Sequence, residues 1–195
     1  ANLGNLIESH HPAFAHTQLL QLETRHGFAF ALRRALALVE TRFVLVVQHD
    51  RIVTRPFDLR RALSAFDEIA SCKYICFQTR QTVGGAHQAR VRSRANGSHV
   101  KFPPPLLLQA DSSSTTTTTT LPTPSIAPLA FWYDSTHVAE VAHYREFVFQ
   151  ETMRRERGIT DVDGPGTGVR LKLGDFVEDT VGHQLLDAVK TRGFA

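Results

Sequence analysis

Apolar and polar residues follow one another along this chain in blocks that predict a repeated order of strand, turn, helix and strand. Residues 17–23 are expected to form a strand, and a turn follows in which Gly27 permits an unusual backbone angle. Between 28 and 40 apolar residues recur at helical spacing in an Ala- and Leu-rich stretch. The almost unbroken apolar run 43–48 then predicts a strand buried on both faces. This order is typical of a βαβ unit in a mostly parallel sheet.

The same alternation continues beyond the strand at 43–48. Pro56 and Asp58 precede an amphipathic run, which is a favourable start for a helix, and Asp134 or Ser135 can cap a later one. The further predicted elements are a helix over 56–70, strands over 73–79 and 128–133, a helix from 136 toward 156, a short strand over 169–173 and a helix from about 180 to 189. The predicted fold class is therefore α/β, with a Rossmann-like, mostly parallel sheet flanked by helices.

The middle of the chain differs in composition from both flanks. Residues 80–101 are basic and contain glycine, and we interpret them as a loop, with a role in covering a phosphate or acceptor as the alternative. Residues 109–126 include six consecutive threonines, so we predict a low-complexity disordered insertion there. The remainder of 1–195 is expected to form a single domain.

The composition limits the classes of protein to which this chain can belong. The chain has 195 residues, of which 42% are apolar and 21% charged, and this suits one globular domain with its own core. The net charge of +3 is mostly scattered, which argues against nucleic acid as a partner. Two cysteines, Cys72 and Cys76, are expected to be buried free thiols rather than a disulfide framework.

The chain ends give little information about cellular location. No apolar run approaches the ~20 residues of a membrane span, so no membrane span is expected, and no signal peptide is seen at the start. The first residue is Ala, which suggests a piece of a longer protein. The compartment stays open between the cytoplasm and the ER or Golgi.

Two groups of polar residues stand where a site could form. His49, Asp50 and Arg51 follow the apolar strand, and ligands gather at the carboxyl ends of strands in open α/β sheets. Glu178 and Asp179 precede a predicted helix, where a carboxylate can take a proton from a nucleophile. Each group also has a structural interpretation: Asp50 as a turn residue, and the acidic pair as a complement to the helix dipole.

Taken in order, these features resemble family 2-type glycosyltransferases of the GT-A fold. In that family a helix precedes a strand that ends in an Asp-x-Asp motif, and here the matching triplet is Gln48-His49-Asp50. A later Glu-Asp motif is matched by Glu178-Asp179 within 174–180, and the passage 131–137 resembles the segment that family members place near donor and acceptor. The resemblance covers about residues 17–79 and 128–190.

The resemblance implies an inverting transfer of a sugar from a nucleotide-sugar donor to a hydroxyl of a carbohydrate or glycoconjugate acceptor. Asp179, with Glu178 beside it, takes the place of the catalytic base, and Asp50, helped by His49, is expected to hold Mg²⁺ or Mn²⁺ against the donor diphosphate. The residues expected near phosphate or substrate are His49, Arg51, Trp132, Asp134 and His183. For Trp132 a core position is an equal alternative to stacking on a sugar, and for His183 a solvated helix position is the alternative.

Two departures from the family pattern shape a second hypothesis. Gln48 replaces the first acid of the motif, and residues 1–16 contain no recognisable nucleotide-binding strand. We therefore expect the isolated chain to bind the donor base poorly and to have little activity by itself. The alternative is a non-catalytic GT-A-like domain that binds a carbohydrate or a protein.

Overall fold

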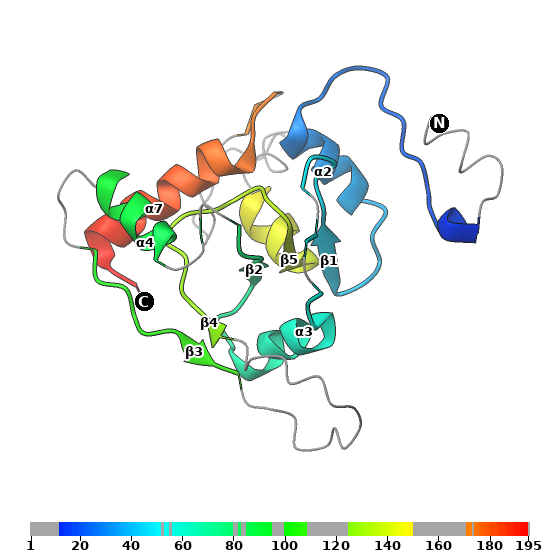
Figure 1. The fold of residues 1–195 in the computed structure, drawn as a ribbon. Coiled ribbons are helices and arrows are strands. Elements are labelled where there is room, and N and C mark those ends of the chain that lie inside the picture. Colours follow the sequence, from blue (N-terminus) through cyan, green and yellow to red (C-terminus); the bar gives the residue numbers. More distant parts are fainter. Residues whose placement is uncertain are drawn as a thin grey trace, which may run out of the picture.

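The fold is α/β, with a small three-stranded sheet at its centre and helices on several sides (Figure 1). The computed structural model describes residues 12–51, 53–54, 56–79, 82, 85–94, 100–108, 125–149, 171–172 and 174–194. The helices are η1 (Pro12–Phe14), α2 (Phe28–Leu36), α3 (Leu59–Glu68), α4 (Ala86–Arg94), α5 (Val141–His143) with the π-helical turn η2 (Tyr144–Val148), and the π-helical turn η3 (Glu178–Gly182) that continues as α7 (His183–Arg192). The strands are β1 (Phe43–Val46), β2 (Tyr74–Cys76), β3 (Leu106–Leu107), β4 (Ser125–Ile126) and β5 (His137–Glu140).

The central sheet is antiparallel, so the predicted mostly parallel sheet is wrong. Its strand order is β1-β5-β2, and β5 runs antiparallel to both neighbours. β1 and β2 consequently point in the same direction, as expected from their helical connection, but they are separated by β5 and do not pair. The alternation of strand and helix correctly indicates direction, whereas it cannot show that a later segment inserts between the two strands.

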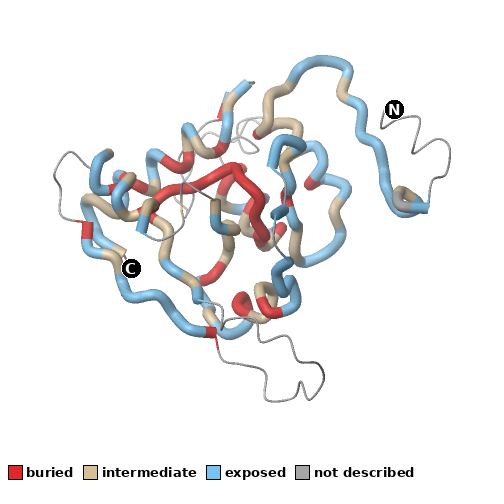
Figure 2. Tube along the Cα trace, in the orientation of Figure 1, coloured by how far each residue is buried: buried red, intermediate tan, exposed pale blue. Residues whose placement is uncertain are grey.

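β5 occupies a segment that the sequence predicts to be helical. The apolar spacing of Val138, Val141 and Ala142 suits a helix, yet every residue from 131 to 139 is buried (Figure 2). A segment that is covered on all sides has no polar face, so its helical periodicity carries no information about its structure. The predicted helix begins only at Val141, and residues 150–156 of it lie outside the described residues.

Of the other predicted elements, the helices are confirmed and two of the strands are wrong. The helices expected at 28–40, 56–70 and 180–189 are confirmed as α2, α3 and α7, with shifted ends, and both cysteines are free thiols. The predicted strands at 17–23 and 128–133 are irregular chain, and α4 forms within the basic stretch interpreted as a loop. Residues 15–21 are exposed and run outside the body of the molecule (Figure 1), so they have no strand partner there.

Two predicted segments are only partly described. Of the predicted insertion at 109–126, residues 109–124 lie outside the described residues, while Ser125 and Ile126 form β4 and pair with β3. Of the predicted strand at 169–173, only Leu171 and Lys172 are described, and they are not in a strand.

β1 is less buried than its apolar sequence suggests. Val44 packs into the main core with α2, and Phe43 packs against Phe66 of α3. Leu45 and Val47, however, are 40% and 52% exposed. The prediction of burial on both faces is therefore wrong for β1, which pairs on one side only within the described part of the chain.

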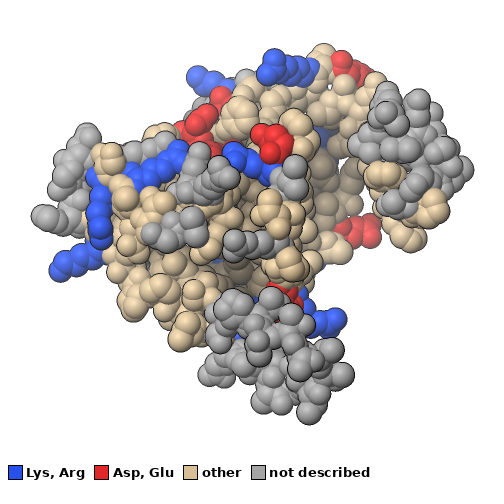
Figure 3. Space-filling view, in the orientation of Figure 1, with Lys and Arg blue, Asp and Glu red and all other residues tan. Residues whose placement is uncertain are grey.

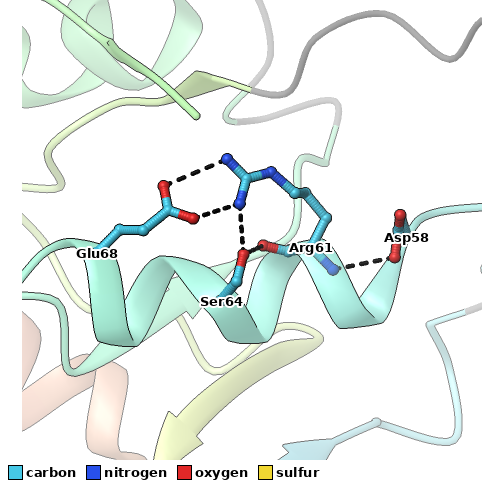
Figure 4. Close-up of polar contacts among 4 residues, drawn as sticks. All are labelled: Asp58, Arg61, Ser64 and Glu68. Carbon is cyan, nitrogen blue, oxygen red and sulfur yellow. Dashed lines mark hydrogen bonds and ion pairs between the residues drawn. The ribbon is translucent and has the colours of Figure 1, made fainter. Parts of the chain in front are cut away.

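α3 begins at Leu59, within the predicted helix 56–70, because Asp58 caps it (Figure 4). The Asp58 carboxylate accepts a hydrogen bond from the Arg61 backbone N–H at 3.0 Å. The Arg61 side chain is buried along the helix, where it is bonded to the carboxylate of Glu68 and the hydroxyl of Ser64. This charge-assisted contact offsets the cost of burying the guanidinium and lowers the pKa of Glu68.

The start of α2 is fixed to the segment that leads to Glu178. Gly27 has a φ of 75°, and a Cβ atom there would lie 2.5 Å from the Cα of Gly174. Backbone hydrogen bonds join Gly174 N–H to the carbonyl of His26 at 3.0 Å and Ala29 N–H to the carbonyl of Asp175 at 3.2 Å. Glycine at both positions thus permits a close backbone approach between segments far apart in sequence.

Candidate functional site

Three chain segments meet at one edge of the central sheet. β1 ends at Val46 and β2 at Cys76, and both residues lie opposite His137, the first residue of β5. The turns that follow β1 and β2 therefore adjoin residues 134–136, which lead into β5. The start of η3 joins the same edge because Glu178 is hydrogen-bonded to this lead-in segment. Both polar groups predicted from the sequence, after 43–48 and before the final helix, thus belong to one edge.

Asp134 and Glu178 form a reciprocal pair of hydrogen bonds. The Asp134 carboxylate accepts from the Glu178 backbone N–H at 2.9 Å, and the Glu178 carboxylate accepts from the Asp134 backbone N–H at 3.3 Å. The other Asp134 oxygen accepts from the indole Nε1–H of Trp132 at 3.2 Å. Asp134 is only 3% exposed, so its carboxyl is a buried group with both oxygens in use.

Burial changes the titration of Asp134. It raises the carboxyl pKa from 3.8 to about 7, because the charged form loses its hydration. The hydrogen bond from the Glu178 backbone opposes this shift, and the negative charges of Glu178 and Asp179 add to it. Asp134 is therefore partly protonated near neutral pH.

The predicted base and its neighbour have different surroundings. Asp179 is exposed on η3, whereas the Glu178 side chain is turned toward Asp134 and toward α4. One Glu178 oxygen lies 3.7 Å from the Arg90 guanidinium, which also lies 5.6 Å from the ring centre of Tyr133. Of the two acids, Asp179 is the more exposed.

The residues after β1 form an exposed turn at the same edge. Arg51 N–H donates to the carbonyl of Gln48 at 3.1 Å, and His49, Asp50 and Arg51 are all exposed. The Cys76 thiol at the end of β2 is near enough to this turn and to the helix start for charges of both to act on it. Burial raises its pKa, its hydrogen bond with Ser135 opposes the rise, and the charges of Glu178 and Arg51 act on it in opposite directions.

The remaining substrate-binding predictions concern Trp132 and His183. Trp132 is buried, with its ring centre 4.2 Å from that of Tyr74 and 5.4 Å from that of Tyr144. This burial favours the core interpretation of Trp132 over stacking on a sugar. His183 is exposed at the start of α7, and its ring meets the edge of Phe131 at 5.3 Å between centres.

Contacts that join distant segments were not foreseen from the sequence. Arg90 comes from the basic stretch interpreted as a loop, and it reaches Glu178 from α4. Cys76 meets Ser135 at 3.2 Å, and the Tyr74 hydroxyl donates to the Tyr133 carbonyl at 2.5 Å. No local spacing signals these contacts, since each joins residues more than fifty positions apart.

The donor set for a metal at this edge is small. Within the described residues there is no group of three or more His, Cys, Asp or Glu side chains placed to hold an ion. Asp50 and His49 offer at most two side-chain ligands from this turn. Mg²⁺ is commonly held by one or two carboxylates together with substrate phosphates, so these residues fit an ion that arrives with a diphosphate better than a fully protein-bound one.

Surface charge near the site is mixed. Basic side chains gather on the side of the molecule formed by α4 and α7, with acidic side chains nearby (Figure 3). No helix in the described part of the chain is long and apolar enough to cross a membrane.

Comparisons of the chain with protein-family models, curated proteins and solved structures found no match.

Proposed function

We propose that this chain carries the transfer site of an inverting glycosyltransferase of the family 2 type, with a GT-A-like fold. The donor would be a nucleotide sugar, and the acceptor a hydroxyl of a carbohydrate or glycoconjugate. The observation that carries the proposal is that two exposed groups lie toward one edge of the sheet: His49, Asp50 and Arg51 after β1, and Asp179 at the start of η3. A site for metal-assisted transfer needs an anion-binding side and a base on the same open surface.

The proposed chemistry divides between the two groups. Asp179 would take the proton from the acceptor hydroxyl, which then attacks the anomeric carbon of the donor. Arg51 and His49 would contact the diphosphate that leaves, and Asp50 would hold Mg²⁺ or Mn²⁺ beside it. When bound, the ion would supply positive charge opposite the growing negative charge of the leaving group.

The base assignment is tested with Asp179→Asn. This assay and the later assays of transfer and donor binding use the full-length protein, because the isolated chain is expected to have little activity. The change removes the proton acceptor at nearly constant size, and a general base contributes roughly 10²–10⁴-fold, so we expect transfer to fall by that factor with donor binding little changed. Release of nucleoside diphosphate from a panel of UDP- and GDP-sugars with Mn²⁺ provides the readout. Asp187→Asn is the matched control, because Asp187 is exposed on α7, where its carboxylate pairs with Lys190. A variant that retains more than about a tenth of wild-type transfer removes Asp179 from the role.

The metal assignment is tested with Asp50→Ala. We expect donor binding, measured by calorimetry with Mn²⁺, to weaken in the variant because the carboxylate ligand is lost. EDTA should weaken donor binding to the wild-type protein in the same way. Asp67→Ala serves as a control, since Asp67 is also exposed but pairs with Arg42 near the other end of β1. Equal donor binding by all three proteins with and without EDTA would contradict a metal at Asp50.

The second candidate is a non-catalytic domain of the same class that binds a carbohydrate or a protein. It is favoured by Gln48 in the place of an acid and by the small donor set at 48–51. The two candidates differ in one measurement. A binding domain would bind ligand without releasing nucleoside diphosphate from any donor, and Asp179→Asn would not change that result.

A further inference from the structure

We infer that Asp134 is a positioning residue, which caps the helix that begins at η3 and so holds Asp179 at the edge of the sheet. The inference rests on the proposed function in giving Asp179 the role of base. It assigns Asp134 a task different from the substrate contact expected from the sequence.

The first turn of this helix depends on a cap from elsewhere in the chain. The backbone N–H groups at a helix start have no partner within the helix, and the residue preceding η3 provides no side-chain cap. The Asp134 carboxylate supplies one, because it accepts the Glu178 N–H at 2.9 Å across 44 residues of sequence. The capped residue is the immediate neighbour of Asp179.

Asp134 is itself fixed on every side. Its second oxygen accepts from Trp132, and its own N–H donates to the Glu178 side chain. With 3% exposure, the carboxyl lies beneath the surface that a substrate can reach. It is therefore suited to orient Asp179 rather than to contact substrate.

The helix start is held from two further directions. Arg90 of α4 lies 3.7 Å from the Glu178 carboxylate, and the backbones of Gly174 and Asp175 are bonded to the start of α2. Asp179 is exposed and lies beside these fixed groups. The position of its carboxylate therefore depends on the first turn of the helix. Misplacement of a reacting group by about 1 Å can cost on the order of 10²-fold in rate.

The charged and titratable groups that face Asp134 come from three elements. They are Glu178 and Asp179 of η3, Tyr74 of β2 and Tyr144 of η2, with Arg90 of α4 paired to Glu178. Asn at position 134 preserves the size of the side chain and adds no buried charge. One of its two polar positions becomes an NH₂ group, which meets an N–H donor and so breaks one of the two bonds.

The test is Asp134→Asn in the wild-type and Asp179→Asn backgrounds, with Asp187→Asn as the control. We expect Asp134→Asn alone to lower kcat by about 10–100-fold with donor Kd within about 3-fold, because the base is displaced. In the Asp179→Asn background the same change should have no further effect on kcat. An equal loss in both backgrounds would show a general structural role and overturn the inference.

A second readout is independent of activity. Amide hydrogen exchange at Glu178 should become at least ~10-fold faster in Asp134→Ala, which leaves no side-chain acceptor for that N–H, while exchange at Leu186 in the same helix stays as in wild type. Unchanged exchange at Glu178 in Asp134→Ala overturns the cap. If Asp179→Asn leaves transfer intact, the proposed function fails instead, and the exchange result still decides whether Asp134 caps the helix.

Trp132→Phe provides a second variant if Asp134→Asn does not fold. It removes the indole N–H donor and leaves the bond to Glu178. We expect a smaller loss of kcat that also disappears in the Asp179→Asn background. A loss that persists there contradicts the positioning role.

Discussion

His137 is a buried histidine whose two ring nitrogens are both in use. It has no exposed surface, and its Nδ1 lies 2.5 Å from the Ser135 carbonyl, which can only accept. Nδ1 therefore carries the proton, and Nε2 accepts from the Tyr144 hydroxyl at 2.5 Å. Burial lowers the pKa of His137 to about 4, so the ring is neutral at physiological pH. This pair fixes the first residue of β5 at the candidate site.

Tyr144→Phe tests the pair. The change leaves the buried Nε2 of His137 without a donor, and a buried unsatisfied group costs about 1–3 kcal/mol of unfolding free energy. Urea unfolding at pH 7.5 gives the loss. In the double variant His137→Leu/Tyr144→Phe both partners are gone, so the loss should be smaller than the sum of the two single losses. Additive losses, or a single-variant loss below about 0.5 kcal/mol, would argue against the pair.

At the scale of elements, the contact between Gly27 and Gly174 sets the position of α2 relative to the final helix. Gly27 combines a φ of 75° and a ψ of 169° with a backbone neighbour that leaves no room for a Cβ atom. Gly193, after α7, has nearly the same backbone angles, with a φ of 76° and a ψ of −173°, but nothing within 4 Å of a Cβ atom. A comparison of the same substitution at the two glycines therefore separates the cost of backbone strain from the cost of steric overlap.

Gly27→Ala should destabilise the protein more than Gly193→Ala. Backbone strain costs on the order of 1–3 kcal/mol in either variant, and only Gly27→Ala adds overlap with Gly174. Chemical unfolding of both variants gives the comparison. Equal losses would mean that the two segments do not approach as described.

At the scale of the whole molecule, buried titratable groups set how stability depends on pH. Burial lowers the pKa of His87, His137 and His143 to about 4 each and raises that of Asp134 to about 7. As pH falls below 6.5 the unfolded histidines take up protons and the folded ones do not, so the native state loses stability until about pH 4. Asp134 acts in the opposite sense, because the folded carboxyl binds a proton below about pH 7 and the unfolded one only near 3.8.

We expect the unfolding free energy to decrease as the pH falls from 6.5 to 4. Each fully shifted group contributes about 1.4 kcal/mol per pH unit, and three histidines oppose one aspartate. Urea unfolding at intervals between pH 7.5 and 4.5 measures the slope. Asp134→Asn removes the opposing contribution, so its slope should be steeper. A flat profile in both proteins would contradict the neutral buried histidines.

The sequence predicts features that depend on neighbouring residues. Asp58 precedes an amphipathic run, and it caps α3 in the structure. The Ala- and Leu-rich spacing predicts α2, and the polar residues after 43–48 and before the last helix are correctly identified as the ends of elements. Capping and amphipathic periodicity act within one or two turns of chain, so they can be recognised without tertiary information.

Only the tertiary structure decides where β5 goes and what Asp134 does. A segment buried on all sides loses the periodic pattern that separates helix from strand, so 137–140 is misjudged and the sheet is antiparallel instead of parallel. The contact between Asp134 and Glu178 joins residues 44 positions apart, and the burial of Trp132 depends on Tyr74 and Tyr144. By itself the sequence determines which segments form helices with a polar face and which acids stand at element ends. The packing of distant segments determines which of those acids is buried and bonded to the Glu178 backbone and which is exposed to solvent.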